Sequence, residues 1–261
     1  MRLETDLHGA VGRGEIGVHL QPQVDLASGR VVAVEALARW DHPVLGAVPP
    51  DVFIPLAEAS GLIREVGVHV LAEACRTVAA WQVDGLHLEV AVNVSAVQLT
   101  DPGFTATVER ILRETDLPCS RLILEVTESQ VLSAVATRHG HLEELDGLGV
   151  GISVDDFGTG YSSLAQLNRL PVSEMKVDRS FTARLADDAR SPMVAGIVGL
   201  GHGLGLRIVA EGVETEGQLR ALRAMGCERG QGYLFGRPAL PAAVRESILE
   251  AARRAPAAGP S

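Results

Sequence analysis

The sequence predicts an α/β protein, a TIM-like (β/α)8 barrel with an irregular first strand. Short runs rich in β-branched residues alternate with amphipathic stretches of helical spacing, and this alternation implies parallel strands. Several of the apolar runs also carry polar side chains at or near their ends, where a closed barrel builds its site. Acids that converge there repel one another unless cations lie among them, so a metal-dependent site is expected. The side chains are Glu35, Asn93, Glu125, the pair Asp155 and Asp156, Lys176 and Glu211.

The length and composition fit one domain. A chain of 261 residues is long enough for a single large barrel. Apolar residues make up 46% of the chain but aromatic residues only 3%, so the core must be aliphatic. We expect the barrel domain to span residues 1–250 and residues 251–261 to form a disordered tail.

Charge and cysteine content restrict the class of protein. The formal net charge of −10 argues against binding to a nucleic-acid polymer, which needs a basic surface. A small anionic ligand stays compatible with this charge if cations offset it. The three cysteines are odd in number and lack metal-ligand spacing. The N-terminal residues lack the apolar core of a signal peptide, and no apolar run is long enough to span a bilayer, so we expect a cytoplasmic protein without a membrane segment.

The first part of the chain should place two strands at the start of the barrel. Pro22 is expected to end regular pairing of the first strand, since proline has no backbone donor. In the second strand, Glu35, Leu37 and Arg39 share one face by alternation, and a glutamate and an arginine on one face suit a metal–phosphate site. The expected elements are helix 3–13, strand 16–22, strand 31–40 and helices 51–61 and 63–81.

The rest of the chain repeats the strand–helix unit. Residues 127–130 and 215–218 both fit the pattern of a helix capping box. A glycine-rich turn at 157–160 follows the aspartate pair. The expected strands are 88–93, 122–126, 151–155, 175–177, 208–210 and a short one near Gln231, and the expected helices are 104–115, 131–145, 179–186, 191–204, 216–225 and 242–254.

The aspartate pair is the strongest single signal. Adjacent strand residues point to opposite faces, so Asp155 and Asp156 can reach one site only where the strand ends and the backbone turns. Gly158 and Gly160 supply that freedom. Such a pair suits two divalent ions, although taken alone it fits equally well a solvated turn whose aspartates cap the next helix. The other acids favour the first interpretation, because burying several unpaired acids is expensive.

The other polar residues each have a second interpretation. Asn93 supplies a neutral oxygen ligand or forms a turn, and Glu125 is hard to explain without a cation. Glu128 lies at a helix start, where it favours the helix dipole. Glu211 and Glu214 fit helix N-terminal acids, although Glu211 directly follows a strand. The histidines at 139 and 141 lie in a polar helical stretch, so we interpret them as surface residues and not as metal ligands.

The chain contains a single lysine. Of its 23 basic residues, 22 are arginines, and the one lysine, Lys176, lies between apolar residues in a strand. A compact ammonium differs from a planar guanidinium in geometry, hydration and ease of pKa shift. Chance survival of one surface lysine is the alternative, but the position in a strand favours a function.

The motifs together resemble those of the EAL domain family, bacterial phosphodiesterases that linearise cyclic di-GMP to the dinucleotide pGpG. They occur in the family's order and spacing across about residues 3–245. The stretches that carry the resemblance are EALARW at 35–40, VNVSAVQL at 92–99, LEVTES at 124–129, DDFGTGYSSL at 155–164, MKVDRSF at 175–181, AEGVETEGQL at 210–219 and QGYLFGRP at 231–238.

The resemblance implies a role for each matching residue and two divalent cations, Mg²⁺ or Mn²⁺, as cofactors. Lys176 would contact the hydrolytic water, Glu211 would act as base or as a ligand of the second metal, and Glu128 would steady the loop after the aspartates. The implied first-metal ligands are Glu35, Asn93, Glu125 and Asp155, and Asp156 is the implied second-metal ligand. The implied substrate-binding residues are Gln21, Leu37, Arg39, Glu214 and Gln231.

Departures from the family pattern lie outside the expected metal ligands. His19 and Leu20 replace two aromatic residues, and Val97 replaces an arginine. An active phosphodiesterase for this cyclic dinucleotide is therefore the first hypothesis, and a non-catalytic cyclic di-GMP receptor or protein-docking module is the second. The resemblance also predicts a homodimer formed through the loop 156–163, and fusion to or regulation by sensory or GGDEF domains.

Overall fold

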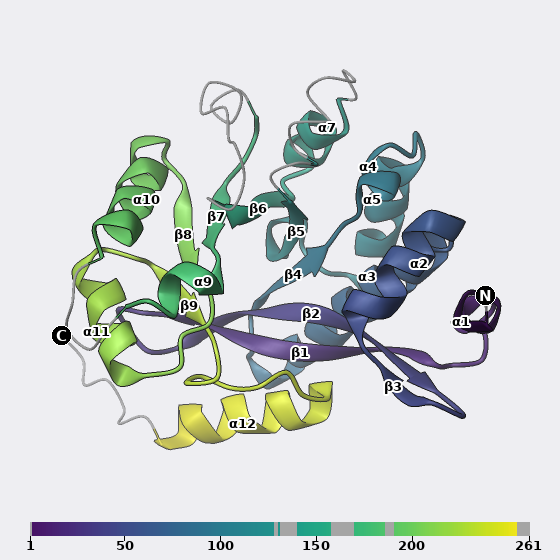
Figure 1. The fold of residues 1–261 in the computed structure, drawn as a ribbon, viewed down its shortest axis with the longest axis horizontal. Helices are drawn as coiled ribbons and strands as arrows, with labels where there is room; N and C mark the ends of the chain where they lie inside the picture. Colours follow the sequence, from purple (N-terminus) through teal and green to yellow (C-terminus); the bar gives the residue numbers. More distant parts are fainter. Residues whose placement is uncertain (1, 128–129, 131–139, 158–169, 186–190, 255–261) are drawn as a thin grey trace.

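The computed structural model describes all residues except 1, 128–129, 131–139, 158–169, 186–190 and 255–261. Eight strands close into a barrel with helices around it (Figure 1). The barrel strands are β1 (Ile16–Asp25), β2 (Val31–His42), β4 (Glu89–Asn93), β5 (Leu122–Thr127), β6 (Gly151–Phe157), β7 (Glu174–Val177), β8 (Arg207–Ala210) and β9 (Arg229–Gln231). The predicted TIM-like barrel is confirmed.

The first strand is the irregular one. Strands β2 and β4 to β9 pair in parallel around the barrel, but β1 lies antiparallel to both β2 and β9 and closes the barrel between them. A short strand that the sequence pattern did not predict, β3 (Gly46–Val48), extends β2 as an antiparallel hairpin outside the barrel (Figure 1). The helices between parallel strands supply the crossovers that such pairing needs.

The prediction that Pro22 ends the pairing of β1 was wrong. Pro22 lies opposite Val34 in the ladder with β2, and β1 continues to Asp25. The backbone N–H of Leu20 donates to the carbonyl oxygen of Ala239, on the side of β1 away from β2. Because backbone donors alternate along an antiparallel strand, the nitrogen of Pro22 faces the same side. Pairing with β9 starts only at Gln23, so the proline removes no ladder bond.

The helices agree with the predicted order but differ at their ends. The first helix stops at Leu7 and not at residue 13, and the chain then turns through Gly9, whose φ of 74° is left-handed. In the predicted helix 179–186, residues 179–182 are helical, residues 183–185 are not, and residue 186 lies outside the described part. The first nine residues of the predicted helix 131–145 also lie outside it. The helices are α1 (Arg2–Leu7), α2 (Pro50–Ser60), α3 (Ile63–Trp81), α4 (Ala96–Leu99), α5 (Phe104–Thr115), α7 (His141–Gly147), α9 (Arg179–Thr182), α10 (Pro192–Gly203), α11 (Glu216–Ala224) and α12 (Pro241–Arg254), with short 3-10 turns at Gln82–Asp84 and Cys119–Arg121.

Local sequence signals account for several of these ends. The capping box at the start of α11 is present, because Thr215 accepts from the backbone of Gln218 and the Gln218 side chain returns to Thr215. The backbone N–H of Thr127 donates to the side chain of Gln130. Helix α12 packs against β1 and runs to Arg254 (Figure 1), so residues 251–254 of the predicted disordered tail are helical. Residues 255–261 lie outside the described part, and their disorder stays a prediction.

The core lies between the barrel strands and the surrounding helices. It is mostly aliphatic, and α3 contributes a continuous buried face that includes Val66, Val70, Cys75 and Val78. An edge-to-face contact between Trp40 and Phe53 joins β2 to α2. None of the helices in the described ranges is long and apolar enough to cross a bilayer.

Two glycines on α10 test how this helix packs on the barrel. A Cβ at Gly201 would lie 2.2 Å from Ile208 Cδ1 and 2.9 Å from Met175 Cε, whereas a Cβ at Gly199 would have no atom within 4 Å. Gly201→Ala should lower the free energy of unfolding by about 1–3 kcal/mol because it overpacks the core. Gly199→Ala should raise it by about 0.5–1 kcal/mol through helix propensity. Urea denaturation of both variants measures this, and equal effects would contradict the packing of α10 described above.

Candidate active site

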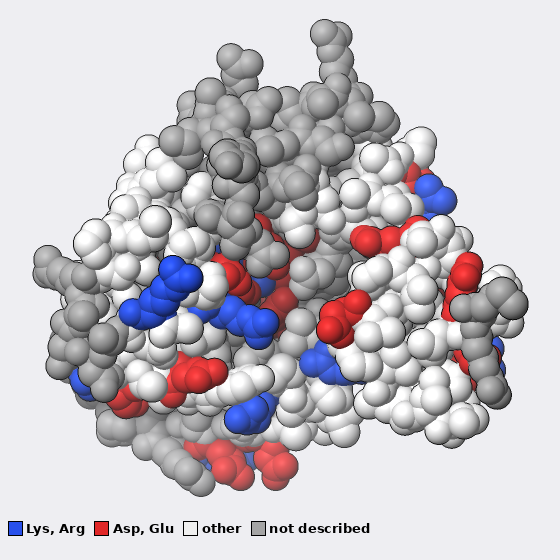
Figure 2. All heavy atoms as spheres, in the orientation of Figure 1, with Lys and Arg blue, Asp and Glu red and all other residues white. Residues whose placement is uncertain are grey.

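The polar residues at the strand ends meet in a hollow of the barrel. In Figure 2, acidic side chains (red) lie deep in a hollow at the centre of the face, with basic side chains (blue) nearby. A cleft of about 580 Å³ opens beside them between β2, α2 and α3. Leu37 and Arg39 from β2, Asn93 from β4 and Glu125 from β5 line this cleft. The strand ends therefore place charged groups next to a space for a small molecule.

Lys176 is the centre of the acid cluster. Its ammonium nitrogen Nζ lies 2.7 Å from Glu211 Oε1 and 3.0 Å from Glu125 Oε2. It also lies 3.5 Å from both Glu35 Oε1 and Asp155 Oδ1. The lysine is completely buried, and the four acids come from β2, β5, β6 and the residue after β8. One compact cation therefore contacts carboxylates from four separate elements.

The acids of the cluster differ in how easily they ionise. Burial and then the charge of Glu35 raise the pKa of Glu125 well above its usual value. Burial opposes ionisation of Glu35 too, but Lys176 and the hydrogen bond from Gln231 outweigh it and hold its pKa below the usual value. Burial raises the pKa of Glu211 to about 7, with Lys176 opposing the shift. Burial lowers the pKa of Lys176, but the surrounding carboxylates more than compensate and keep it charged. The cluster thus holds more acid than its one cation neutralises.

Amide side chains donate hydrogen bonds to both carboxylate oxygens of Glu35. Asn93 Nδ2 donates to Glu35 Oε1 over 2.8 Å and to Glu125 Oε2 over 3.1 Å. Gln231 Nε2 donates to Glu35 Oε2 and, over 2.9 Å, to Gln21 Oε1. Gln21 Nε2 donates in turn to the carbonyl oxygen of Gly236 over 3.0 Å. The orientation of the Glu35 carboxylate is therefore set by donors on two sides.

The donor set fits a hard divalent cation. Carboxylate and amide oxygens are the ligands that Mg²⁺ and Mn²⁺ prefer. Glu125 Oε1 is buried and has no hydrogen-bond partner among the described residues, so it is an acceptor that a cation would satisfy. Within the described ranges, no three acidic, histidine or cysteine side chains form a metal shell by themselves. A complete shell would therefore draw on the Asn93 amide or on Asp156, whose side chain lies outside the description.

The structure brings most of the predicted site residues together and leaves some predictions open. Glu214 is exposed, and its backbone N–H donates to Gln218, so its role in substrate binding stays a prediction. Glu128 lies outside the described residues, as does most of the loop 156–163 on which the predicted homodimer rests. The histidine at 141 contacts Thr105 and Glu144, away from the cluster, and residue 139 lies outside the described part. The residues that do converge are Gln21, Glu35, Asn93, Glu125, Asp155, Lys176, Glu211 and Gln231, with Leu37 and Arg39 in the adjoining cleft.

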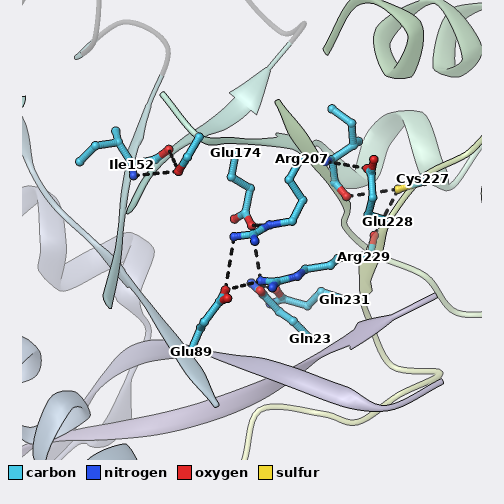
Figure 3. Close-up of polar contacts among 11 residues, drawn as sticks. Gln23, Glu89, Ile152, Glu174, Arg207, Cys227, Glu228, Arg229 and Gln231 are labelled. Atoms are coloured by element: carbon cyan, nitrogen blue, oxygen red, sulfur yellow. Dashed lines mark hydrogen bonds and ion pairs between the residues drawn. The ribbon is translucent and has the colours of Figure 1, made fainter. Parts of the chain in front are cut away.

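A second charged cluster at the opposite end of the barrel was not predicted. Arg229 Nη1 lies 2.6 Å from Glu89 Oε2, and Arg207 Nε lies 2.7 Å from Glu174 Oε2 (Figure 3). Arg207 also reaches Glu89 over 3.3 Å. These four residues are the first residues of β4, β7, β8 and β9. A charged residue at the start of each of these four strands was the signal in the sequence that could have indicated this cluster. A further residue that was missed, Gln23, donates to Gln231.

Comparison with known proteins identifies the type of domain. The family model described as the EAL domain matches residues 4–238. Over 241 residues the chain is 48% identical to the bifunctional diguanylate cyclase/cyclic di-GMP phosphodiesterase MucR of Pseudomonas aeruginosa, a match that covers 91% of this chain and 35% of that protein. It is 43% identical to the cyclic di-GMP phosphodiesterase NbdA of the same organism, over 97% of this chain and 32% of the relative. The chain thus spans about a third of the length of these relatives.

A solved structure resembles this chain in fold as well as in sequence. The PaMucR phosphodiesterase in complex with c-di-GMP superimposes with a TM-score of 0.87 and 46% sequence identity. The match covers 94% of this chain and all of that one. The similarity therefore extends over nearly the whole chain.

The buried lysine should be essential for stability in the absence of divalent cations. Lys176→Met leaves four carboxylates without their cation, so the free energy of unfolding at neutral pH should fall by about 3–5 kcal/mol. Adding Glu35→Gln to that variant should recover part of the loss, because it removes a carboxylate whose pKa Lys176 holds below the usual value. Urea denaturation in EDTA measures both variants. A Lys176→Met protein as stable as the wild type would mean that the acids do not depend on the ammonium.

Proposed function

Because the chain belongs to the EAL domain family, we propose that it is a metal-dependent phosphodiesterase that hydrolyses cyclic di-GMP to linear pGpG. The observation that carries this proposal is the convergence of four carboxylates and one buried ammonium beside a cleft. Four acids that the resemblance assigns to metal or water, Glu35, Glu125, Asp155 and Glu211, lie within 3.5 Å of Lys176 Nζ. Asn93 contacts two of them. Cations bound by an acid cluster of this kind would offset the negative charge of a phosphate, as hydrolysis of a phosphodiester requires.

Two divalent cations, Mg²⁺ or Mn²⁺, would be held by the oxygens of this cluster. Bound there, they would supply Lewis-acid stabilisation of the phosphate and lower the pKa of a water. The unpartnered oxygen of Glu125 and the amide of Asn93 make both residues ready ligands. Glu35, Asn93, Glu125 and Asp155 would hold one cation, and Asp156 and Glu211 the other.

The substrate would occupy the cleft beside the cluster. Arg39 lies on its wall, and burial lowers the pKa of its guanidinium without removing the charge at neutral pH. A guanidinium in this position can pair with a phosphate through two hydrogen bonds. Leu37 offers an apolar surface on the same strand face, and Gln21 and Gln231 supply amides. Together these residues suit a small ligand that carries both phosphates and planar bases.

The proton of the attacking water has an acceptor in the cluster. Glu211 touches Lys176, and it would act either as this proton acceptor or as a ligand of the second cation. Asp156 is the alternative acceptor. Water would attack the phosphorus in line, so that one P–O bond forms and the bond to the 3′ oxygen breaks. The 3′ oxygen takes up a proton to become a hydroxyl, and the ring opens at one ester. Lys176 orients the water or offsets the developing charge.

A non-catalytic cyclic di-GMP receptor or docking module is the second candidate. Members of the family that lose catalysis also lose acids from the cluster or from the DDFGTG loop. This chain retains the acids, and its DDFGTG sequence at 155–160 is intact. Retention of the full set favours the enzyme, and the two candidates differ in whether product forms.

Product formation should require a divalent cation. Incubation with cyclic di-GMP and Mg²⁺ should give pGpG, detected by chromatography. EDTA should abolish the product and added Mg²⁺ or Mn²⁺ should restore it, because the acid cluster cannot otherwise accept a phosphate. Binding of cyclic di-GMP without any product would favour the receptor. Undiminished hydrolysis after thorough chelation would contradict the metal mechanism.

Lys176→Arg should separate binding from turnover. A guanidinium keeps the positive charge but is wider and planar, and it cannot place one compact donor within 2.7–3.5 Å of four carboxylates. We expect cyclic di-GMP binding to persist and kcat to fall at least about tenfold, or about 1.4 kcal/mol of transition-state stabilisation. Steady-state kinetics and a binding titration on this variant measure both quantities. A rate within about twofold of the wild type would make Lys176 a structural charge.

A further inference from the structure

Gln23 is a buried amide that is linked to the acid cluster through a hydrogen bond to Gln231. It lies on β1 directly opposite Gln231 of β9 and is completely buried. Its Nε2 donates to Gln231 Oε1 over 3.0 Å, and Figure 3 shows the two side chains next to each other. Its own Oε1 has no hydrogen-bond partner among the described residues. Burying an unpaired carbonyl oxygen is costly, so an apolar side chain would suit this position better if packing alone mattered.

The donated bond decides which way the Gln231 amide faces. With its oxygen taken by Gln23, Gln231 directs its NH₂ group to Gln21 Oε1 and Glu35 Oε2. Rotation of the amide by 180° would turn its carbonyl oxygen toward the Glu35 carboxylate, which leaves two acceptors facing each other without a proton. It would also place two NH₂ groups, those of Gln23 and Gln231, against each other. Gln23 therefore stabilises one of the two amide orientations.

The backbone that carries Gln231 is held from the opposite end of the barrel. Strand β9 has only three residues, and Arg229, at its start, contacts Glu89 over 2.6 Å and Glu174 over 3.6 Å (Figure 3). The charged cluster thus anchors the strand two residues before Gln231. This anchor holds the backbone but does not determine which way the Gln231 amide faces. Gln23 favours the orientation in which that amide donates to Gln21 and Glu35.

We propose that Gln23 is a positioning residue for the divalent-cation site: it orients the Gln231 amide, which in turn orients the Glu35 carboxylate. The inference rests on the proposed function, since it concerns Glu35 as a cation ligand. Glu35 Oε1 is held by Asn93, and Oε2 is held by Gln231, so losing the second donor frees the carboxylate to rotate. Hydrogen-bond partners behind a metal ligand fix its orientation, and removing them commonly weakens metal affinity 10–100-fold.

Mn²⁺ affinity, read from the EPR signal of the free ion, tests this without relying on turnover. Gln23→Met retains the size of the side chain but removes the donor, and it should weaken Mn²⁺ binding by about tenfold. Gln23→Asn, which is too short to reach Gln231, should weaken it similarly and provides a second variant if the first fails to fold. Val78→Ala is the control: it removes buried methyl groups from α3, away from the cluster, so it should lower stability but leave Mn²⁺ affinity unchanged.

A double-mutant cycle tests whether Gln23 acts through Gln231. Gln231→Met alone should weaken Mn²⁺ binding at least as much as Gln23→Met. In the Gln231→Met background, Gln23→Met should have no further effect, because the amide that it orients is absent. Full additivity of the two changes would overturn the positioning role.

The outcomes separate this inference from the function on which it rests. A wild-type protein that binds no Mn²⁺ would overturn the metal-dependent function and the inference with it. A wild-type protein that binds Mn²⁺ and forms pGpG, with folded Gln23 variants that bind Mn²⁺ within about twofold of it, would overturn the inference alone. Weakened binding in the Gln23 variants, unchanged binding in Val78→Ala and a non-additive cycle would support it.

Discussion

The buried ammonium of Lys176 is the interaction on which the site depends. Removing a charged group from water costs several kcal/mol even after the protein relaxes around it, so the fully buried Lys176 stays charged only because opposite charges lie close to it. Here those charges come from four different elements of the barrel. The same contacts therefore satisfy the lysine and hold Glu35, Glu125, Asp155 and Glu211 together. No single strand could do this, which explains why the site requires a closed barrel.

The two ends of the barrel interior differ in how their charges balance. At the end where the strands start, Glu89 and Glu174 face Arg207 and Arg229, so acids and bases match in number. At the other end, four carboxylates face one ammonium, and the raised pKa values of Glu125 and Glu211 report the excess of acid. The charges of the balanced cluster offset one another, which fits a structural role, although Glu174 Oε1 has no hydrogen-bond partner among the described residues. In the unbalanced cluster the carboxylates repel one another, and a bound cation would relieve this repulsion. The contrast favours the end around Lys176 as the site of cation binding.

The sequence was sufficient to predict features that follow from local patterns. It did not predict contacts between residues that are far apart in the chain. Strand–helix alternation and acids at strand ends predicted the parallel barrel and the cluster around Lys176, because these follow from strand direction alone. The path of β1 through Pro22 could not be predicted, since the pattern does not reveal which side of a strand is paired. Gln23 was missed for a related reason: it meets Gln231 only because antiparallel β1 closes the barrel against β9. The charges at residues 89, 174, 207 and 229 were visible, but their pairing across the barrel was not.

The two strands that close the barrel, β1 and β9, contribute a different chemistry from the strands that supply the acids. The parallel strands β2, β5 and β6 and the end of β8 deliver acids, whereas β1 and β9 deliver the amides Gln21, Gln23 and Gln231 where the barrel closes. An acid at these positions would add repulsion to a cluster that already exceeds its cation, and an apolar residue would leave Glu35 Oε2 without a donor. An amide avoids both problems, because it is neutral and can donate and accept at once. The closure of the barrel thus supplies oriented hydrogen bonds to Glu35 without adding charge.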